Sequence, residues 1–131
     1  MPNFNSTSTG LRVMLSQKET LAVGQYLASK KGAKATTPHS DTLIVYSLDD
    51  TPFAYLETGK QLLKLSLRSD PVLSKVLRDK YEEVTPGQKL NPKVWNTIVI
   101  SGQLSFDEIK ALIDHSYHQA RVINDAIDEA L

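Results

Sequence analysis

Hydrophobic and polar residues alternate through the middle of the chain, and apolar residues recur at helical spacing towards its end. Three short runs have the alternation and composition of strands, at residues 43–46, 53–56 and 62–68. The segments between them, residues 48–52 and 58–60, are short enough for hairpins. The pattern therefore predicts an antiparallel meander, with a weaker strand signal near residues 34–37, before Pro38.

The run at residues 62–68 has two different faces. Because successive side chains of a strand point to opposite sides, Leu63, Leu65 and Leu67 fall together on one of them. The other face carries the polar and cationic residues Lys60, Lys64, Ser66 and Arg68. The sequence thus predicts a sheet with one apolar core face and one basic face.

Two helices should flank this meander. Ser16 and Glu19 have the spacing of a capping box, so a helix is expected from there to about residue 30, with Gly32 as its stop. Asp70 as N-cap and Pro71 in the first turn begin a second helix. Its apolar stripe is predicted to consist of Leu73, Val76, Leu77 and Tyr81.

The last helix has the clearest start signals. Ser105 and Glu108 form another capping box, and Leu104 and Ile109 occupy the positions of a hydrophobic staple. Its stripe at helical spacing comprises Phe106, Ile109, Leu112, Ile113, Ser116, Ala120, Ile123 and Ile127. This helix is expected to cover one face of the sheet.

Length and composition narrow the class of protein. A chain of 131 residues fits one domain, and we expect a flexible tail at residues 1–15 followed by a single domain at residues 16–131. The absence of cysteine removes disulfides and thiolate chemistry and suits a reducing compartment. The first ten residues do not resemble a secretory signal, and no apolar run reaches membrane-spanning length. We therefore expect a cytoplasmic protein without a membrane partner.

The charge is balanced overall but uneven along the chain. Fifteen Lys and Arg match fifteen Asp and Glu, so the net charge lacks the strong basic excess of a dedicated nucleic-acid binder. Residues 60–93, however, contain eight basic and four acidic side chains, and residues 103–131 contain two basic and six acidic ones. This asymmetry predicts a basic side and an acidic side.

Asp114, His115 and Ser116 have the residue types of a nucleophilic triad, but consecutive positions on a helix point in different directions. Asp114 and His118 do share a helical face, and with His115 they could present a carboxylate and imidazoles to a metal. The alternative is a solvated ion pair. His39 belongs to no cluster. We expect no catalytic centre and no cofactor, and the sequence leaves metal binding by these three side chains open.

Residues 86–97 combine a Pro-Gly turn, an Asn-Pro helix start and the only tryptophan, which enters a strand expected to end near Ile100. Trp95 is either a core anchor or a stacking platform for a base, and its place at a helix-to-strand corner favours the core. Asn96 would satisfy backbone groups at that corner. Tyr46 and Tyr55 either pair across the sheet or project from an exposed face.

Together with Ser116 and Tyr117, this stretch resembles the MmcQ/YjbR family of small bacterial proteins, over about residues 20–123. The chain keeps the residues of the family pattern at Pro86, Gly87, Asn91, Trp95, Asn96 and Thr97. It has Gln88, Lys89, Leu90 and Pro92 where Tyr, His, Met and Lys are usual. Any role of the usual histidine is therefore absent, and Lys89 adds a permanent charge.

The resemblance implies an α+β fold of two layers, with an antiparallel sheet packed against helices. In the family this is described as a double-wing arrangement that loosely resembles type III secretion chaperones. It also implies DNA binding, a role given to the family on structural grounds.

The leading hypothesis is a non-enzymatic protein that contacts the phosphate backbone of nucleic acid with low sequence specificity. The contact residues would be Lys60, Lys64, Arg68, Lys89 and Lys93. The same cations could instead keep a solvated sheet face soluble. The alternative function is a protein-interaction or chaperone-like adaptor that uses a sheet edge or the acidic last helix. The sequence is compatible with a monomer or a homodimer.

Overall fold

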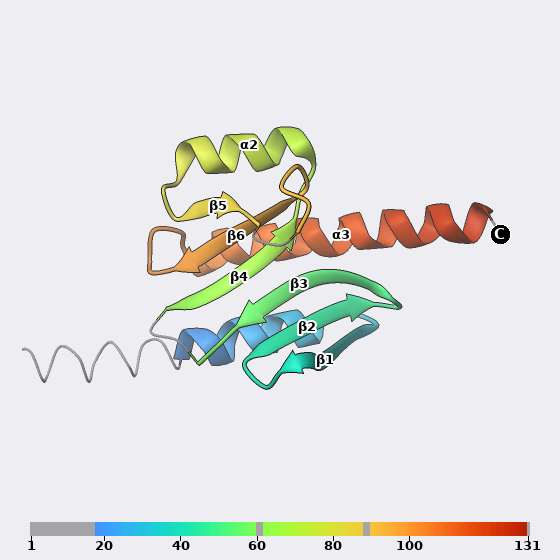
Figure 1. Ribbon diagram of the computed structural model, residues 1–131, viewed down its shortest axis with the longest axis horizontal. Helices are drawn as coiled ribbons and strands as arrows, with labels where there is room; N and C mark the ends of the chain where they lie inside the picture. The colour runs from blue at the N-terminus through green and yellow to red at the C-terminus, as the bar shows by residue number, and fades with distance from the viewer. Residues whose placement is uncertain (1–17, 60–61, 88–89, 131) are drawn as a thin grey trace, which may run out of the picture.

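The computed structural model describes residues 18–59, 62–87 and 90–130. Within them, six strands form one antiparallel sheet in the order β1-β2-β3-β4-β6-β5 (Figure 1). The strands are β1 Ala33–Ser40, β2 Leu43–Leu48, β3 Thr51–Glu57, β4 Leu63–Arg68, β5 Val84–Pro86 and β6 Trp95–Ile100. Because β1 to β4 are neighbours in chain order, the predicted meander is confirmed, with the weak first strand included.

The described helices all pack on one face of the sheet. They are a first helix over residues 18–29, α2 Pro71–Lys80 and α3 Phe106–Ala130. In Figure 1 the first helix and α3 lie behind the sheet, and α2 lies beside the β5 edge. Each helix contributes to the same hydrophobic cluster, through Val23 and Leu27, Leu77, and Ile109 and Ile113. The result is the expected two-layer α+β fold.

The core lies between this helical layer and the sheet. Leu63, Leu65 and Leu67 of β4 are all buried, as their alternation predicted. Across the β4–β6 pair, Leu63 faces Ile100 and Leu65 faces Ile98, and both isoleucines are also buried. Period-two alternation therefore correctly identified the core side of the central strand.

The local start signals of two helices are confirmed by their hydrogen bonds. The Asp70 carboxylate accepts the Leu73 N–H at 2.9 Å, and Pro71 occupies the first turn of α2. Ser105 and Glu108 exchange reciprocal bonds of 3.1 and 3.3 Å at the start of α3. Such caps satisfy N–H groups that the helix itself cannot pair. Ser16 and the predicted tail fall outside the described residues.

Two predicted stripes are wrong in part. On α2, Val76 is 51% exposed, while the polar Ser74 is fully buried. The reason is that α2 docks through polar contacts: the Ser74 hydroxyl shares a hydrogen bond with the Ser69 hydroxyl, and the Ser74 carbonyl accepts the side-chain amide of Asn96. On α3, Phe106 and Ile127 are exposed because they lie near the ends of a helix whose C-terminal part extends past the sheet (Figure 1).

The sequence does not predict strand β5, because Pro86 and Gly87 indicate a turn. Pro86 is instead the last residue of this strand, paired with Asn96. A three-residue strand has no measurable alternation, and its proline is tolerated only because β5 lies at the sheet edge. No helix among the described residues combines the length and hydropathy needed to cross a membrane.

Candidate functional site

None of the described helices covers the second face of the sheet, which we call the open face. Its side chains belong to directly paired positions of β2 to β6, which point to the same side: Leu43, Val45, Tyr55, Glu57, Lys64, Ser66, Arg68, Thr85, Trp95, Thr97 and Val99. Val45 and Trp95 are only 6% and 5% exposed, yet neither belongs to the core cluster behind the sheet. The open face therefore has a small packed centre of its own.

That centre is built from Tyr55, Arg68 and Trp95. The rings of Tyr55 and Trp95 meet edge to face with centroids 5.2 Å apart, and the Arg68 guanidinium carbon lies 4.6 Å from the Trp95 ring centre. The Arg68 Nε also donates to the Pro52 carbonyl at 2.7 Å. Partial burial lowers the pKa of Arg68, and the nearby Tyr55 opposes that shift. These contacts fix the guanidinium in one orientation.

The structure separates the two tyrosines for which the sequence left two arrangements open. Tyr46 is buried on the core face, with its ring centre 6.5 Å from that of Phe53. Tyr55 projects from the open face, opposite Val45 and Ser66. The two tyrosines therefore do not pair with each other.

The predicted contact residues occupy different environments. Lys64 and Arg68 share the open face of β4, and Lys64 lies directly opposite Glu57 of β3, where opposite charges favour the strand pair. Lys93 is exposed on the turn just before Trp95. Lys60 and Lys89 lie outside the described residues. Lys64 and Arg68 therefore lie on one surface. Lys93 lies on the turn that leads into β6.

The residues from Asn91 to Thr97 form a hydrogen-bonded corner. The Asn91 backbone carbonyl accepts the N–H groups of Val94 and Trp95, and its side chain accepts the Lys93 N–H at 3.1 Å. Thr97 and Ser66 share a hydroxyl bond of 2.8 Å across β6 and β4. Trp95 is buried, as the anchor interpretation predicted, but on the open face and outside the main core.

Asn96 points to the opposite side and connects the corner to α2. Its amide donates to the Ser74 carbonyl at 3.1 Å, and its side-chain oxygen accepts Arg78 Nη1 at 3.3 Å. Arg78 also donates to the Pro92 carbonyl at 2.8 Å. No pattern in the sequence indicates this role of Arg78, because only the folded chain brings α2 beside the turn. This guanidinium therefore contributes to structure at the corner.

Ser116 and Tyr117, the family-like pair on α3, are structural contacts behind the sheet. The buried Ser116 hydroxyl contacts the backbones of both β3 and β4. Tyr117 donates its hydroxyl to the Lys31 carbonyl and packs edge-on against Phe53, with ring centres 5.5 Å apart. These two residues join α3 to the sheet and to the segment after the first helix.

The acidic and histidine residues of α3 point to separate partners. Asp114 accepts the Tyr26 hydroxyl at 2.6 Å and the Lys30 ammonium at 2.7 Å. His115 Nε2 accepts the Asp70 N–H at 3.3 Å, whereas His118 is exposed. Across the described parts of the chain, no three histidine or carboxylate side chains gather in a way that could hold a metal ion.

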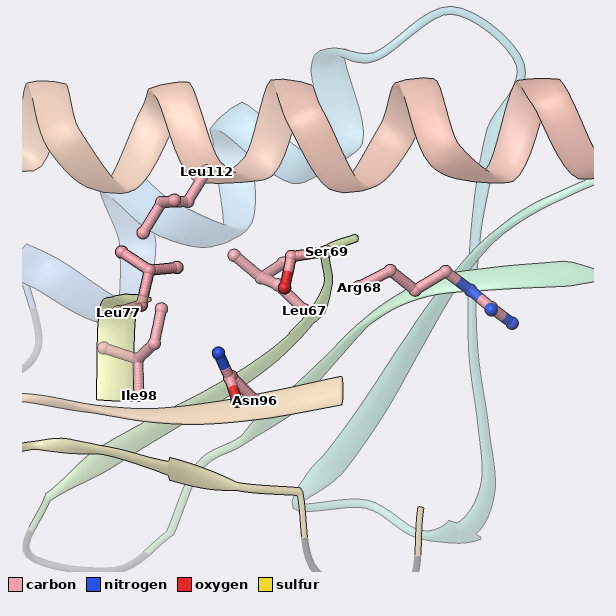
Figure 2. Close-up of a pocket in the computed structure, with 7 residues that line it drawn as sticks. All are labelled: Leu67, Arg68, Ser69, Leu77, Asn96, Ile98 and Leu112. Atoms are coloured by element: carbon pink, nitrogen blue, oxygen red, sulfur yellow. The ribbon is translucent and has the colours of Figure 1, made fainter. Parts of the chain in front are cut away.

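A cavity of about 10 Å³ lies between α2, α3 and the sheet (Figure 2). Leu77, Ile98 and Leu112 are among the residues that line it, while the Arg68 side chain extends away from it. A space of this size holds one water molecule at most. It offers no room for a substrate behind the candidate residues.

Six antiparallel strands with their described helices on one side define a two-layer α+β protein, in which an aromatic and arginine cluster lies at the centre of the open face. The chain belongs to the YjbR family, whose model matches residues 28–119. This confirms the resemblance inferred from the corner residues and from Ser116 and Tyr117.

The relatives support the family and the fold. The chain is 30% identical over 96 residues to the uncharacterized protein YjbR of Escherichia coli, in strains K12 and O157:H7, over 73% of this chain and 81% of that protein. It is similar in structure to Deinococcus radiodurans protein DR2400, a DUF419 domain, with a TM-score of 0.66 and 26% identity over 71% of each chain. A Pseudomonas syringae protein, at 23% identity and a TM-score of 0.63 over 73% of this chain and 93% of its own, shares the fold.

Proposed function

We propose that this protein binds nucleic acid without catalysing a reaction, and that its open face contacts the phosphate backbone. The observation that carries the proposal is the row of side chains on β4, where Lys64, Ser66 and Arg68 all point to a face that no described helix covers. Thr97 and Thr85 extend the row onto β6 and β5. Cationic and hydroxyl side chains are those with which proteins usually contact phosphates.

The buried tryptophan supports contact with the backbone over base recognition. Trp95 is 5% exposed and lies under the Arg68 guanidinium, so a base has little ring surface on which to stack. Binding of this kind is governed by charge, with low sequence specificity and a strong dependence on salt. Lys93, and Lys60 and Lys89 outside the described residues, complete the proposed contact set.

A non-catalytic role is supported by the hydrogen bonds that already occupy the side chains most suited to catalysis. Asp114 is bonded to Lys30 and Tyr26, and His115 accepts the N–H at the start of α2. We also propose the cytoplasm as the compartment, since a cysteine-free chain suits reducing conditions.

A salt titration followed by fluorescence anisotropy tests the proposal, with labelled duplex and single-stranded DNA and RNA. We expect binding at low salt that weakens steeply as salt rises. The double variant Lys64→Gln, Lys93→Gln should bind every sequence more weakly and lower the salt slope by about one for each phosphate that it no longer neutralises. The double variant Lys75→Gln, Lys80→Gln, which removes two exposed lysines of α2 in the helical layer, is the matched control. No binding at low salt, or a double variant that behaves like the control, contradicts the proposal.

A protein-interaction role is the second candidate, favoured by the exposed apolar residues of α3. Val122 and Ile127, in the C-terminal half of that helix, are 50% and 51% exposed. Exposed apolar side chains on one helix are typical of protein contacts. Co-purification of one defined partner, in a preparation free of nucleic acid, would favour this role. Sedimentation of the purified chain would distinguish monomer from homodimer.

A further inference from the structure

A second cavity, of about 320 Å³, lies where α3 meets the β2–β3 turn and the end of the first helix. Its lining includes Lys31, Leu48, Asp49, Arg121 and Asp125. None of these belongs to the open face or to the family-like corner. The volume falls at the lower end of the range for sites that hold small molecules.

The walls of this cavity are tied together by hydrogen bonds. The Tyr117 hydroxyl on α3 donates to the Lys31 carbonyl, which joins α3 to the segment after the first helix. Asn124 donates to the Leu48 carbonyl at 2.9 Å and accepts the Thr51 hydroxyl, which joins α3 to both ends of the β2–β3 turn. The cavity is therefore held in shape without a ligand, and a preformed site lowers the cost of binding.

The β2–β3 turn places an acidic residue with a left-handed backbone on the rim. Asp49 has a φ of 53°, and among the described residues no other non-glycine residue has a positive φ. It occupies the first position of the two-residue connection between Leu48 and Thr51, and its carboxylate lies 3.5 Å from the Asn124 amide. A positive φ is usual for aspartate in a two-residue hairpin connection, and the turn thereby holds this carboxylate beside α3.

The charges around the cavity have both signs. Lys31 and Arg121 supply two cations, and Asp49 and Asp125 supply two carboxylates. Leu48 and the Tyr117 ring add apolar surface. From this arrangement we infer that the cavity binds a small zwitterion of the amino-acid type with an apolar side chain. The ligand carboxylate pairs with Lys31 and Arg121, and its ammonium group pairs with Asp49 and Asp125.

Chemical-shift mapping on the full chain tests this inference, independently of nucleic-acid binding. L-leucine is the probe, with N-acetyl-L-leucine, which lacks the ammonium charge, and L-leucinamide, which lacks the carboxylate, as comparison ligands. We expect L-leucine to perturb the amide signals of Gly32 and Asp49 and the side-chain amide of Asn124, and each comparison ligand to bind at least about tenfold more weakly. Equal binding of N-acetyl-L-leucine, perturbation elsewhere, or no perturbation at millimolar ligand overturns the inference.

Variants then connect the binding to each charge. Arg121→Gln and Asp49→Asn should each weaken L-leucine binding about tenfold or more. Asparagine also tolerates the left-handed backbone at position 49, so that variant removes the charge without a new steric conflict. Lys110→Gln, near the start of α3 and outside the cavity lining, is the matched control. Variants that bind L-leucine as well as this control does would also overturn the inference.

Discussion

The Ser116 hydroxyl on α3 accepts the backbone N–H of Arg68 at 2.8 Å, on the side of the sheet opposite to the Arg68 guanidinium. The same hydroxyl donates to the Phe53 carbonyl. The regular β3–β4 ladder ends at the pair Ala54–Leu67, so Phe53 and Arg68 are the next residues in line without a ladder bond. Ser116 replaces that bond and links the helical layer to the strand end that carries Arg68.

Phe53 gives the physical reason for this arrangement. The β2–β3 register passes from Tyr46 opposite Ala54 to Ser47 opposite Pro52, which leaves Phe53 as the extra residue of a bulge. A bulge turns a side chain and interrupts the ladder, and here the Phe53 ring is fully buried. The Phe53 carbonyl is buried and the Arg68 N–H is partly buried, so both require a polar partner from outside the sheet. Ser116 supplies it.

Replacing Ser116 with alanine removes only one hydroxyl group, but it should destabilise the fold more than the loss of an exposed hydroxyl would. The variant leaves the Arg68 N–H and the Phe53 carbonyl without their partner, which costs about 1–3 kcal/mol for an unsatisfied buried group. Urea denaturation monitored by circular dichroism measures the loss. Ser29→Ala, at an exposed hydroxyl bonded to the Tyr26 carbonyl, is the control and should cost about 0.5 kcal/mol or less. Equal losses in the two variants would show that the Ser116 bridge does not stabilise the sheet.

Replacing Arg68 with methionine should change the environment of the only tryptophan. The variant removes the guanidinium over the Trp95 ring and the bond to the Pro52 carbonyl, but it keeps most of the apolar stem. We expect a shift in Trp95 emission and a loss of about 1–2 kcal/mol in unfolding free energy. Steady-state fluorescence and urea denaturation measure the two effects.

Lys80→Met is a suitable control for this change. Lys80 is the last residue of α2, and its ammonium group lies 5.2 Å from the centre of the Tyr81 ring, away from Trp95. Its emission spectrum should match that of the unmodified protein. An unchanged spectrum in Arg68→Met would mean that the guanidinium does not cover Trp95 in solution, and the argument against base stacking would then fail.

The parts of the fold that depend on neighbouring residues were predictable from the sequence. The alternation in β4, the Asp70 cap and the Ser105–Glu108 capping box each act over a few residues, and all three are present. The cluster of Tyr55, Arg68 and Trp95 was not predictable in the same way. Arg68 faces Trp95 because β6 pairs with β4 and leaves β5 at the edge, and no local pattern encodes that strand order.

The candidate site was predictable only in outline. The basic face of β4 followed from its alternation, but the position of Lys64 opposite Glu57 depends on the β3–β4 register. The cavity beside Arg121 had no local signal, because its walls come from three segments separated along the chain. Buried polar residues such as Ser74 also break the apolar periodicity on which sequence interpretation relies.

Two glycines should respond differently to alanine, because the structure requires them for different reasons. A Cβ at Gly87 would lie 2.9 Å from the Trp95 Cβ and 3.3 Å from the Trp95 carbonyl oxygen. Overpacking of this kind costs about 1–3 kcal/mol, and it should also alter Trp95 emission. Gly102 has a φ of 103° with open space around it, so alanine there strains only the backbone and should leave the emission unchanged. Thermal unfolding and fluorescence of both variants check this contrast. A change in Trp95 emission in Gly102→Ala but not in Gly87→Ala would contradict the prediction.

The contact between Asp114 and Tyr26 should make stability depend on pH at both ends of the scale. Partial burial alone would raise the pKa of Asp114, but the hydrogen bonds from Lys30 and Tyr26 outweigh it and hold that pKa below its ordinary value. The contribution of Asp114 to stability is therefore present above its unfolded pKa of about 4 and is lost as pH falls through the lower native value. The hydrogen bond to Asp114, with smaller effects of burial and charge, raises the pKa of Tyr26 to about 12. The contribution of Tyr26 is present below its unfolded pKa of about 10 and is lost as pH rises from there towards 12.

Asp114→Asn separates these effects. With no carboxylate beside it, Tyr26 should titrate closer to pH 10, and the stability difference between the variant and the original protein should shrink both in acid and in strong base. NMR titration of the Tyr26 ring, assigned with Tyr26→Phe, measures the pKa, and urea denaturation across pH measures stability. Asp79→Asn, which removes an exposed carboxylate on α2, is the control and should leave the pKa of Tyr26 unchanged. If Tyr26 titrates at the same pH in Asp114→Asn as in the original protein, the carboxylate does not accept its hydroxyl in solution.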